Sequence, residues 1–194
     1  MAGIYIHIPF CKQACHYCNF HFSASTQSLD KMVNAICKEI ALQQDFFEDA
    51  NLVIETIYFG GGTPSLIPTK ATALIMDTIK HHFNVNAAAE ITLEANPDDI
   101  TIEKLTEFKT MGINRLSIGV QSFIDEDLVW TNRAHRSEAA VEAIKLAREV
   151  GISNISIDLI YGIPTLTDEN WIQNIDTAVA LGVQHLSCYA LTVE

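Results

Sequence analysis

Short apolar runs rich in Ile, Val, Tyr and Phe alternate along the chain with longer segments in which apolar residues recur at a helical spacing. The short runs predict six β-strands, over residues 3–9, 56–60, 90–95, 115–120, 154–162 and 185–192. The helices between them are predicted to begin at residues suited to capping, near Ser28, Thr69, Thr101, Ser137 and Asp168. The pattern therefore predicts five βα units followed by a sixth strand.

The strand runs are nearly continuous in apolar residues, which is typical of a parallel sheet with both faces covered. We therefore expect an α/β fold, a parallel (βα) barrel that is open or closed, in a single folded unit. The sixth strand is followed only by Thr192, Val193 and Glu194. We expect the N-terminal portion of a longer protein, truncated after its sixth strand, with that strand as an exposed edge.

Charge and hydropathy narrow the classes of partner. The 194 residues carry 24 acidic and 12 basic side chains, and this formal net charge of −12 repels phosphate backbones and anionic membrane surfaces. No uninterrupted apolar run approaches the roughly 20 residues of a membrane span, and the N-terminus lacks the basic region of a signal peptide. We expect a cytoplasmic protein with no transmembrane segment and no nucleic-acid partner.

Three of the five cysteines, Cys11, Cys15 and Cys18, lie within eight residues on a loop directly after the first strand. Three thiolates at this spacing can hold three corners of an iron–sulfur cubane, and the fourth iron is then open to a small chelating molecule. Two alternatives stay open: a zinc ion completed by His16 or His21, and no metal at all. The remaining cysteines, at positions 37 and 188, lie in apolar periodic segments and are predicted to be small buried hydrophobic residues.

Polar residues and glycines stand at the ends of the predicted strands, where α/β barrels build their active sites. Gly60, Gly61 and Gly62 end the second strand, and Glu94 and Gln121 close the third and fourth. Taken alone, a glycine run indicates a turn, and a strand-end carboxylate is as often a loop or capping residue. Asp158 interrupts an apolar run and should have a partner, either a ligand hydroxyl or Arg133, because an unpaired buried charge is costly. A purely structural ion pair is the alternative.

The CxxxCxxC motif after the first strand, followed by Gly60–Pro64 after the second, resembles the radical SAM superfamily. The wider set IYIHIPFCKQACHYCNFHF, IYFGGGTPSL, ITLEANPDD, LSIGVQSF, NRAH, ISIDLIYGIP and LSCYALTVE resembles its oxygen-independent coproporphyrinogen III oxidase family over essentially the whole chain. The resemblance implies a partial barrel of about six strands. Residues 1–194 would then be the radical SAM core domain, without the family's C-terminal domain.

The resemblance also implies cofactors and the residues that hold them. The three clustered cysteines would bind a [4Fe–4S] cluster whose open iron binds S-adenosylmethionine (SAM). Positions that match SAM contacts of the family are Tyr5, Tyr17, Gly61, Gly62, Thr63, Glu94, Gln121, Arg133 and Asp158. Haem ligation by His7, His16, His21 or His135 is a candidate in principle, although exposed or core histidine is the ordinary interpretation.

Two functions occur in this family. Its enzymes use a SAM-derived radical to decarboxylate coproporphyrinogen III, and its haem chaperones keep the cluster site but carry haem to acceptor proteins, including respiratory enzymes. The enzymes have a further cysteine two places after the third, where this chain has Phe20, and an N-terminal extension before the first strand. We therefore expect a haem chaperone, with an electron donor and an acceptor that is in some cases membrane-associated. Coproporphyrinogen dehydrogenase activity is not expected, and whether the capability for SAM cleavage that the resemblance implies is used stays open. A zinc-stabilised structural module would leave the glycine loop unexplained.

Replacing any one of the three clustered cysteines by alanine should abolish stable cluster binding, because three protein ligands are already the minimum for such a site. Iron and acid-labile sulfide, measured after anaerobic reconstitution of Cys11→Ala, Cys15→Ala and Cys18→Ala, test this. Cys37→Ala is the matched control and should keep its iron. Full iron and sulfide in any of the first three variants would refute the assignment.

Overall fold

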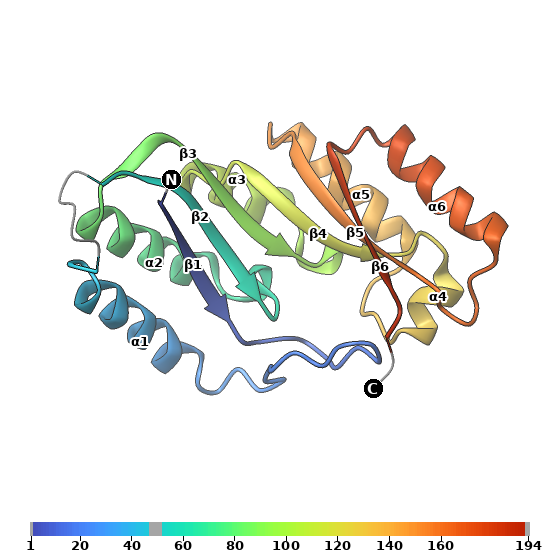
Figure 1. The fold of residues 1–194 in the computed structure, drawn as a ribbon, viewed down its shortest axis with the longest axis horizontal. Coiled ribbons are helices and arrows are strands. Elements are labelled where there is room, and N and C mark those ends of the chain that lie inside the picture. Colours follow the sequence, from blue (N-terminus) through green and yellow to red (C-terminus); the bar gives the residue numbers. More distant parts are fainter. Residues whose placement is uncertain (1, 47–51, 193–194) are drawn as a thin grey trace.

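The computed structural model describes residues 2–46 and 52–192. One parallel six-stranded sheet runs in sequence order across the molecule (Figure 1). Its strands are β1 (Ala2–Ile8), β2 (Ile54–Gly61), β3 (Val85–Ala95), β4 (Arg115–Gln121), β5 (Asn154–Tyr161) and β6 (His185–Ala190). Six α-helices connect them: α1 (Leu29–Leu42), α2 (Thr69–His82), α3 (Ile102–Met111), α4 (Asp125–Trp130), α5 (Ser137–Glu149) and α6 (Asp168–Ala180). The predicted α/β fold, a partial barrel of parallel strands, is confirmed.

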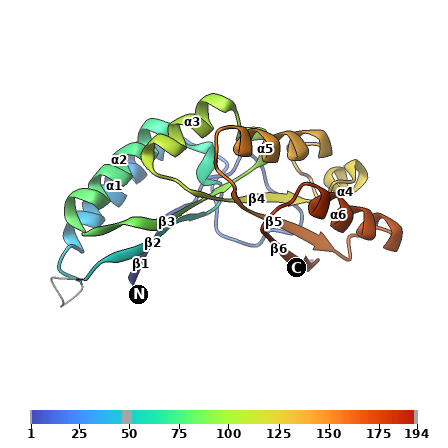
Figure 2. The same cartoon turned by 90° about the horizontal axis from the view of Figure 1, so that it is seen from above.

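The helices lie on one face of the sheet only (Figure 2). This corrects the expectation that both faces would be covered. Apolar side chains that point toward the helices are almost completely buried, as at Ile57, Phe59, Leu93 and Leu116. The opposite, concave face carries the polar strand residues, so the strands alternate more than the nearly continuous apolar runs indicated.

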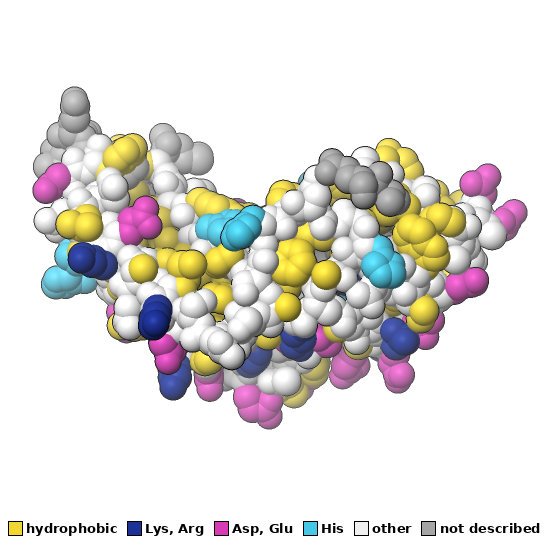
Figure 3. Space-filling model, turned by 90° about the horizontal axis from the view of Figure 1, so that it is seen from below, with side chains coloured by type: hydrophobic (Ala, Val, Ile, Leu, Met, Phe, Trp, Pro, Cys, Tyr) yellow, Lys and Arg dark blue, Asp and Glu magenta, His cyan; other side chains and the backbone are white. Residues whose placement is uncertain are grey.

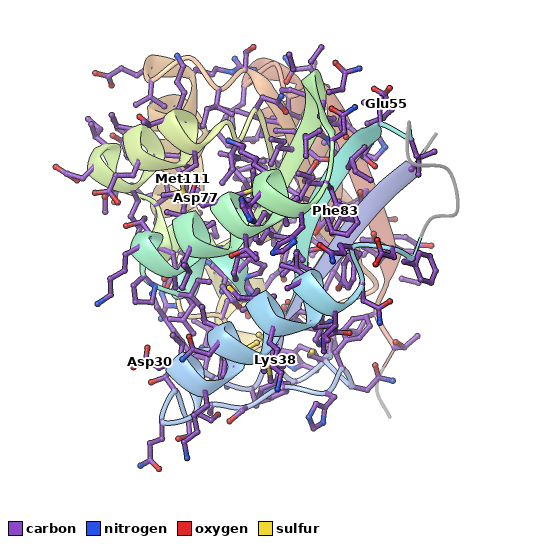
Figure 4. All side chains as sticks on the ribbon, turned by 90° about the vertical axis from the view of Figure 1, so that its left-hand side faces the viewer. Asp30, Lys38, Glu55, Asp77, Phe83 and Met111 are labelled. Carbon is purple, nitrogen blue, oxygen red and sulfur yellow. The ribbon has the colours of Figure 1, made fainter. Side chains whose placement is uncertain are left out.

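The helices are amphipathic and pack on the sheet through their apolar faces. Figure 4 shows α1 and α2 side by side on the outer side of the first strands, with Asp30 and Lys38 turned to solvent. Phe83, the residue directly after α2, packs against the core instead. Acidic side chains gather along the helix margin in Figure 3, away from the hollow between the two ends of the sheet.

Only part of the predicted helix capping is found. Thr101 caps α3 by accepting a hydrogen bond from the Lys104 N–H. The cap of α6 is Thr167, one residue before the predicted Asp168, and it accepts from Asn170 N. Thr69 and Ser137 form no side-chain cap, because the cap positions of α2 and α5 are occupied by Pro68 and Arg136. Ser28 does occupy the cap position of α1, but its side chain makes no capping hydrogen bond.

Three further features differ from the sequence prediction. β3 begins at Val85 rather than near residue 90, and a register shift against β2 accommodates the extra residues. The six-residue helix α4 was not predicted. Cys37 is partly buried against the core, whereas Cys188 is exposed on the edge strand β6, so the prediction of a buried residue is wrong for Cys188.

The free energy of unfolding should depend strongly on the outer face of the sheet. Leu93→Ala removes a fully buried side chain from β3 and should cost roughly 2–5 kcal/mol, because the cavity left behind cannot close completely. Leu74→Ala is the matched control on α2, where Leu74 is 48% exposed, and should cost about 0.5 kcal/mol. Chemical denaturation measures both; equal losses would contradict this assignment of the core.

Candidate functional site

A cavity of about 740 Å³ opens on the concave face, at the carboxyl ends of the strands. All the residues predicted to hold the cluster or to contact SAM line it: Tyr5, Cys11, Cys15, Tyr17, Cys18, Gly61, Gly62, Thr63, Glu94, Gln121, Arg133 and Asp158. The structure therefore brings the predicted residues to one place, from five strands and three loops.

The strand alternation explains how they meet. In register, Glu94 of β3 lies beside Ser117 of β4, and Gly119 of β4 lies beside Asp158 of β5. Because every second residue of a strand points to the same face, these positions share the concave side with Tyr5 of β1. The carboxyl ends of parallel strands thus deliver polar side chains to one wall.

The cysteine loop is held from a distant part of the chain. His16 N donates to Thr131 O at 3.1 Å, and the Gln13 side chain donates to Asn132 O at 2.6 Å. Asn132 in turn donates from its side chain to Ala14 O at 2.7 Å. The segment directly after α4, which the sequence analysis had not assigned to any element, therefore fixes the position of the thiols.

A second anchor joins the same loop to the end of β3. Lys12 Nζ lies 2.6 Å from Asp98 Oδ2 and 2.5 Å from Asp99 Oδ1. Asp99 is buried and also accepts a hydrogen bond from Ser65 Oγ at 2.8 Å. The lysine thus ties the loop to two neighbouring strand ends.

Two of the three thiols have hydrogen-bond donors beside them. Thr63 Oγ1 donates to Cys11 Sγ at 3.6 Å, and Arg133 Nη1 donates to Cys15 Sγ at 3.5 Å. Burial raises the pKa of the Cys11 thiol, and the bond from Thr63 opposes that shift. Within the described residues no three His, Cys, Asp or Glu side chains gather closely enough for a single metal ion.

The glycine run lets the end of β2 approach the cysteine loop. A Cβ atom at Gly62 would lie 2.6 Å from Phe10 O and 3.0 Å from Cys11 Sγ. Gly61 has a φ of +113°, a conformation that side chains disfavour. The glycines are therefore required by the close contact of two loops, in addition to any approach of a ligand.

Glu94 is held at the inner wall by two donors. Tyr58 OH donates to one carboxylate oxygen at 2.8 Å, and Gly61 N donates to the other at 3.1 Å. Burial nevertheless raises the pKa of Glu94. Tyr58 also stacks on Tyr5, with ring centroids 6.0 Å apart. The sequence analysis missed Tyr58, whose only signal is its place two residues before the glycine run.

Arg133 and Asp158 do not pair with one another within ion-pair distance, which corrects the suggested partnership. The guanidinium donates to Tyr17, Asn96 and Gly119 O as well as to the cysteine. Burial raises the pKa of Asp158, and a hydrogen bond from Ser187 opposes the shift. Asn96, directly after β3, was also missed, although its position matches that of the other strand-end polar residues.

Gln121 ends β4 in a left-handed conformation, with a φ of +70° that is uncommon for a residue other than glycine. The preceding carbonyl, Val120 O, accepts a hydrogen bond from His135 Nε2 at 3.1 Å. His135 is 3% exposed, and its Nδ1 has no partner among the described residues. Of the histidines considered for haem, His135 is therefore enclosed in the protein, and His16 donates to Trp130 O.

The donor set fits an iron–sulfur cluster together with a small polar molecule. Three thiols share one wall, and two of them already accept hydrogen bonds of the kind that thiolate ligands receive. At the strand ends, burial disfavours the charged forms of Glu94 and Asp158, so both carboxylates would gain from a cationic or hydroxyl-bearing ligand. The Nε of Arg133 is buried without a partner in the described part of the chain.

Known proteins are similar to this sequence over nearly its whole length. The model of the radical SAM superfamily matches residues 5–178. The haem chaperone HemW of Bacillus subtilis (strain 168) is 38% identical over 196 residues, which is 100% of this chain and 51% of that protein. HemW of Escherichia coli (strain K12) is 36% identical, over 99% of this chain and 51% of its own. The chain thus spans about half the length of the curated relatives it matches.

Solved structures share the fold. Coproporphyrinogen III oxidase (HemN) from Escherichia coli, a radical SAM enzyme, matches 98% of this chain and 44% of its own with a TM-score of 0.91 and 31% identity. The radical SAM methyltransferase TsrM from Kitasatospora setae matches with a TM-score of 0.67 at 14% identity, over 98% of this chain and 36% of its own, a likeness of fold alone. Across residues 2–46 and 52–192, none of the helices has the length and apolar character needed to cross a membrane.

Stability should fall in mild acid because of His135. Burial lowers its pKa from 6.5 to about 4, so between these values the unfolded chain binds a proton there that the folded chain does not. The folded state should lose about 3 kcal/mol through this residue as the pH falls from 7 to 4, and only a little more at lower pH.

Chemical denaturation of the cluster-free protein at pH 7 and pH 4 measures this loss. His135→Gln should show a smaller loss than the wild type, whereas His81→Gln, on the exposed surface of α2, should follow the wild type. The same acid loss in His135→Gln and wild type would contradict the prediction.

Proposed function

The chain belongs to the radical SAM superfamily. We propose that it binds a [4Fe–4S] cluster and SAM, and that it acts as a haem chaperone that delivers haem to haem-dependent proteins. The observation that carries the proposal is the single cavity in which the three clustered thiols face the glycine loop and the polar strand ends. We take residues 1–194 as the radical SAM core domain of that protein.

Each wall of the cavity has its own task in this proposal. Cys11, Cys15 and Cys18 would hold the cluster, whose chemistry, when it is reduced, is to supply one electron to the sulfonium of SAM. Gly61, Gly62 and Thr63 would contact the methionine end of SAM, since all three line the cavity beside the cysteine loop.

The strand-end residues would orient the rest of SAM. The Glu94 carboxylate, fixed by Tyr58 and Gly61, is placed to accept a hydrogen bond from a cationic or hydroxyl group. Asp158 offers a second acceptor and Gln121 an amide, while Tyr5 and Tyr17 add aromatic surface. Enclosure by the concave sheet would exclude water from the bound molecule.

Haem delivery, rather than porphyrin synthesis, is supported by likeness to HemW over the whole chain. The alternative, oxygen-independent decarboxylation of coproporphyrinogen III, is favoured by the likeness to HemN. Against it, Phe20 stands two places after Cys18, lines the cavity and is 72% exposed, so no fourth thiol is available at that position. The proposed partners are haem, haem-acceptor proteins including membrane-associated respiratory enzymes, and an electron donor, and the proposed location of the protein is the cytoplasm.

Electron paramagnetic resonance of the anaerobically reconstituted and reduced protein tests the cofactor site. A cubane signal should appear and should change when SAM is added, because SAM binds the iron that has no protein ligand. Cys15→Ala is the negative control. Zinc in place of iron, or a signal indifferent to SAM, would refute the proposal.

The same preparation separates the two functions. Haem added to the intact protein should give a bound Soret spectrum and move to an apo haem protein, while coproporphyrinogen III should remain unconverted in the presence of SAM and reductant. Conversion of coproporphyrinogen III without haem transfer would establish the alternative.

A further inference from the structure

Arg133 is a guanidinium in the cavity wall without a carboxylate within ion-pair distance among the described residues. Its hydrogen bonds go instead to Cys15 Sγ at 3.5 Å, Tyr17 OH at 3.2 Å, Asn96 Oδ1 at 2.8 Å and Gly119 O at 2.7 Å. A shielded cation is costly unless an anion lies close to it. Asp98 acts on the guanidinium only from beyond that distance, although the chain carries a net charge of −12.

Among the four acceptors of Arg133, only the sulfur of Cys15 becomes an anion when it acts as a metal ligand. The amide of Asn96 and the carbonyl of Gly119 are neutral, and both belong to the ends of strands. They aim the guanidinium at the cysteine loop without neutralising its charge.

The same hydrogen bonds reach a second thiol. Asn96 Nδ2 donates to Thr63 Oγ1 at 3.3 Å, and Thr63 Oγ1 donates to Cys11 Sγ at 3.6 Å. Arg133, Asn96 and Thr63 therefore form one connected set that supplies donors to Cys11 and Cys15 together. Hydrogen bonds and charges beside thiolate ligands are the means by which proteins set the reduction potential of iron–sulfur clusters.

We infer that Arg133 is the counter-cation of the cysteine-held cluster and raises its reduction potential, a positioning role that Asn96 supports. The inference rests on the proposed cluster. Reduction by a one-electron reductant adds one negative charge to the cluster and its three thiolates. A fixed positive charge beside Cys15 stabilises the more negative, reduced form, so electron entry becomes more favourable.

The test is the midpoint potential of the cluster in the intact, reconstituted protein, followed by electron paramagnetic resonance during redox titration. SAM is left out, so that loss of a SAM contact cannot produce the shift. Arg133→Met removes the charge and should lower the reduction equilibrium constant about tenfold, a shift of about −59 mV for one electron. Arg133→Lys keeps the charge and should shift the potential less.

Arg115→Met is the matched control for loss of a half-buried cation. Arg115 donates to Thr92 at 3.2 Å and Ser156 at 3.0 Å, and it approaches no cysteine among the described residues. The midpoint potential of the cluster in Arg115→Met should equal that of the wild type.

The outcomes separate this inference from the proposed function. Failure of the wild type itself to assemble a cluster would refute the proposed function. A normal cluster whose potential is unchanged in Arg133→Met, or shifted equally in Arg133→Met and Arg133→Lys, would overturn the inference alone.

Where Arg133→Met does not retain a cluster, Arg133→Gln takes its place. Loss from both neutral variants with retention in Arg133→Lys supports the inference, and loss from all three assigns Arg133 to folding.

Discussion

Burial of the sheet on one side only is the constraint on which the rest of the structure depends. The helices remove the outer side chains of the strands from water, so the apolar residues collect there, as at Phe59 and Leu93. The inner side chains then form a concave surface that none of the described helices covers. Polar groups such as Glu94 and Asp158 can exist there because they are hydrogen-bonded or open to a ligand.

Separate pieces of the chain converge on the cysteine loop because the parallel strands all end at the same edge. The loop follows β1, yet its contacts come from the end of β3 through Asp98 and Asp99 and from the segment after α4 through Thr131 and Asn132. These contacts join residues more than 80 positions apart along the sequence. The arrangement of the thiols is therefore a property of the folded domain rather than of the local motif.

Sequence reasoning was most successful where a local rule connects residue type to position. The six strands follow from their apolar runs, and Glu94 and Gln121 were found because strand ends build sites in this architecture. Helix α4 was not predicted because its six residues, three of them acidic in the first turn, are too few to show a helical spacing of apolar residues. Tyr58 and Asn96 were missed, and Asp158 was wrongly suggested as the ion-pair partner of Arg133. Such contacts depend on how distant strands align. No local pattern reports that alignment.

The anchoring of the cysteine loop affects how a lost cluster can be rebuilt. Bonds from Gln13, His16 and Lys12 to the rest of the domain belong to the polypeptide alone, so the entropy of ordering the loop is lost when the protein folds. Small zinc domains, by contrast, are ordered only by their metal. A cluster destroyed by oxygen would therefore leave behind a folded receptacle, and repair would require only new iron and sulfide, with no refolding of the chain.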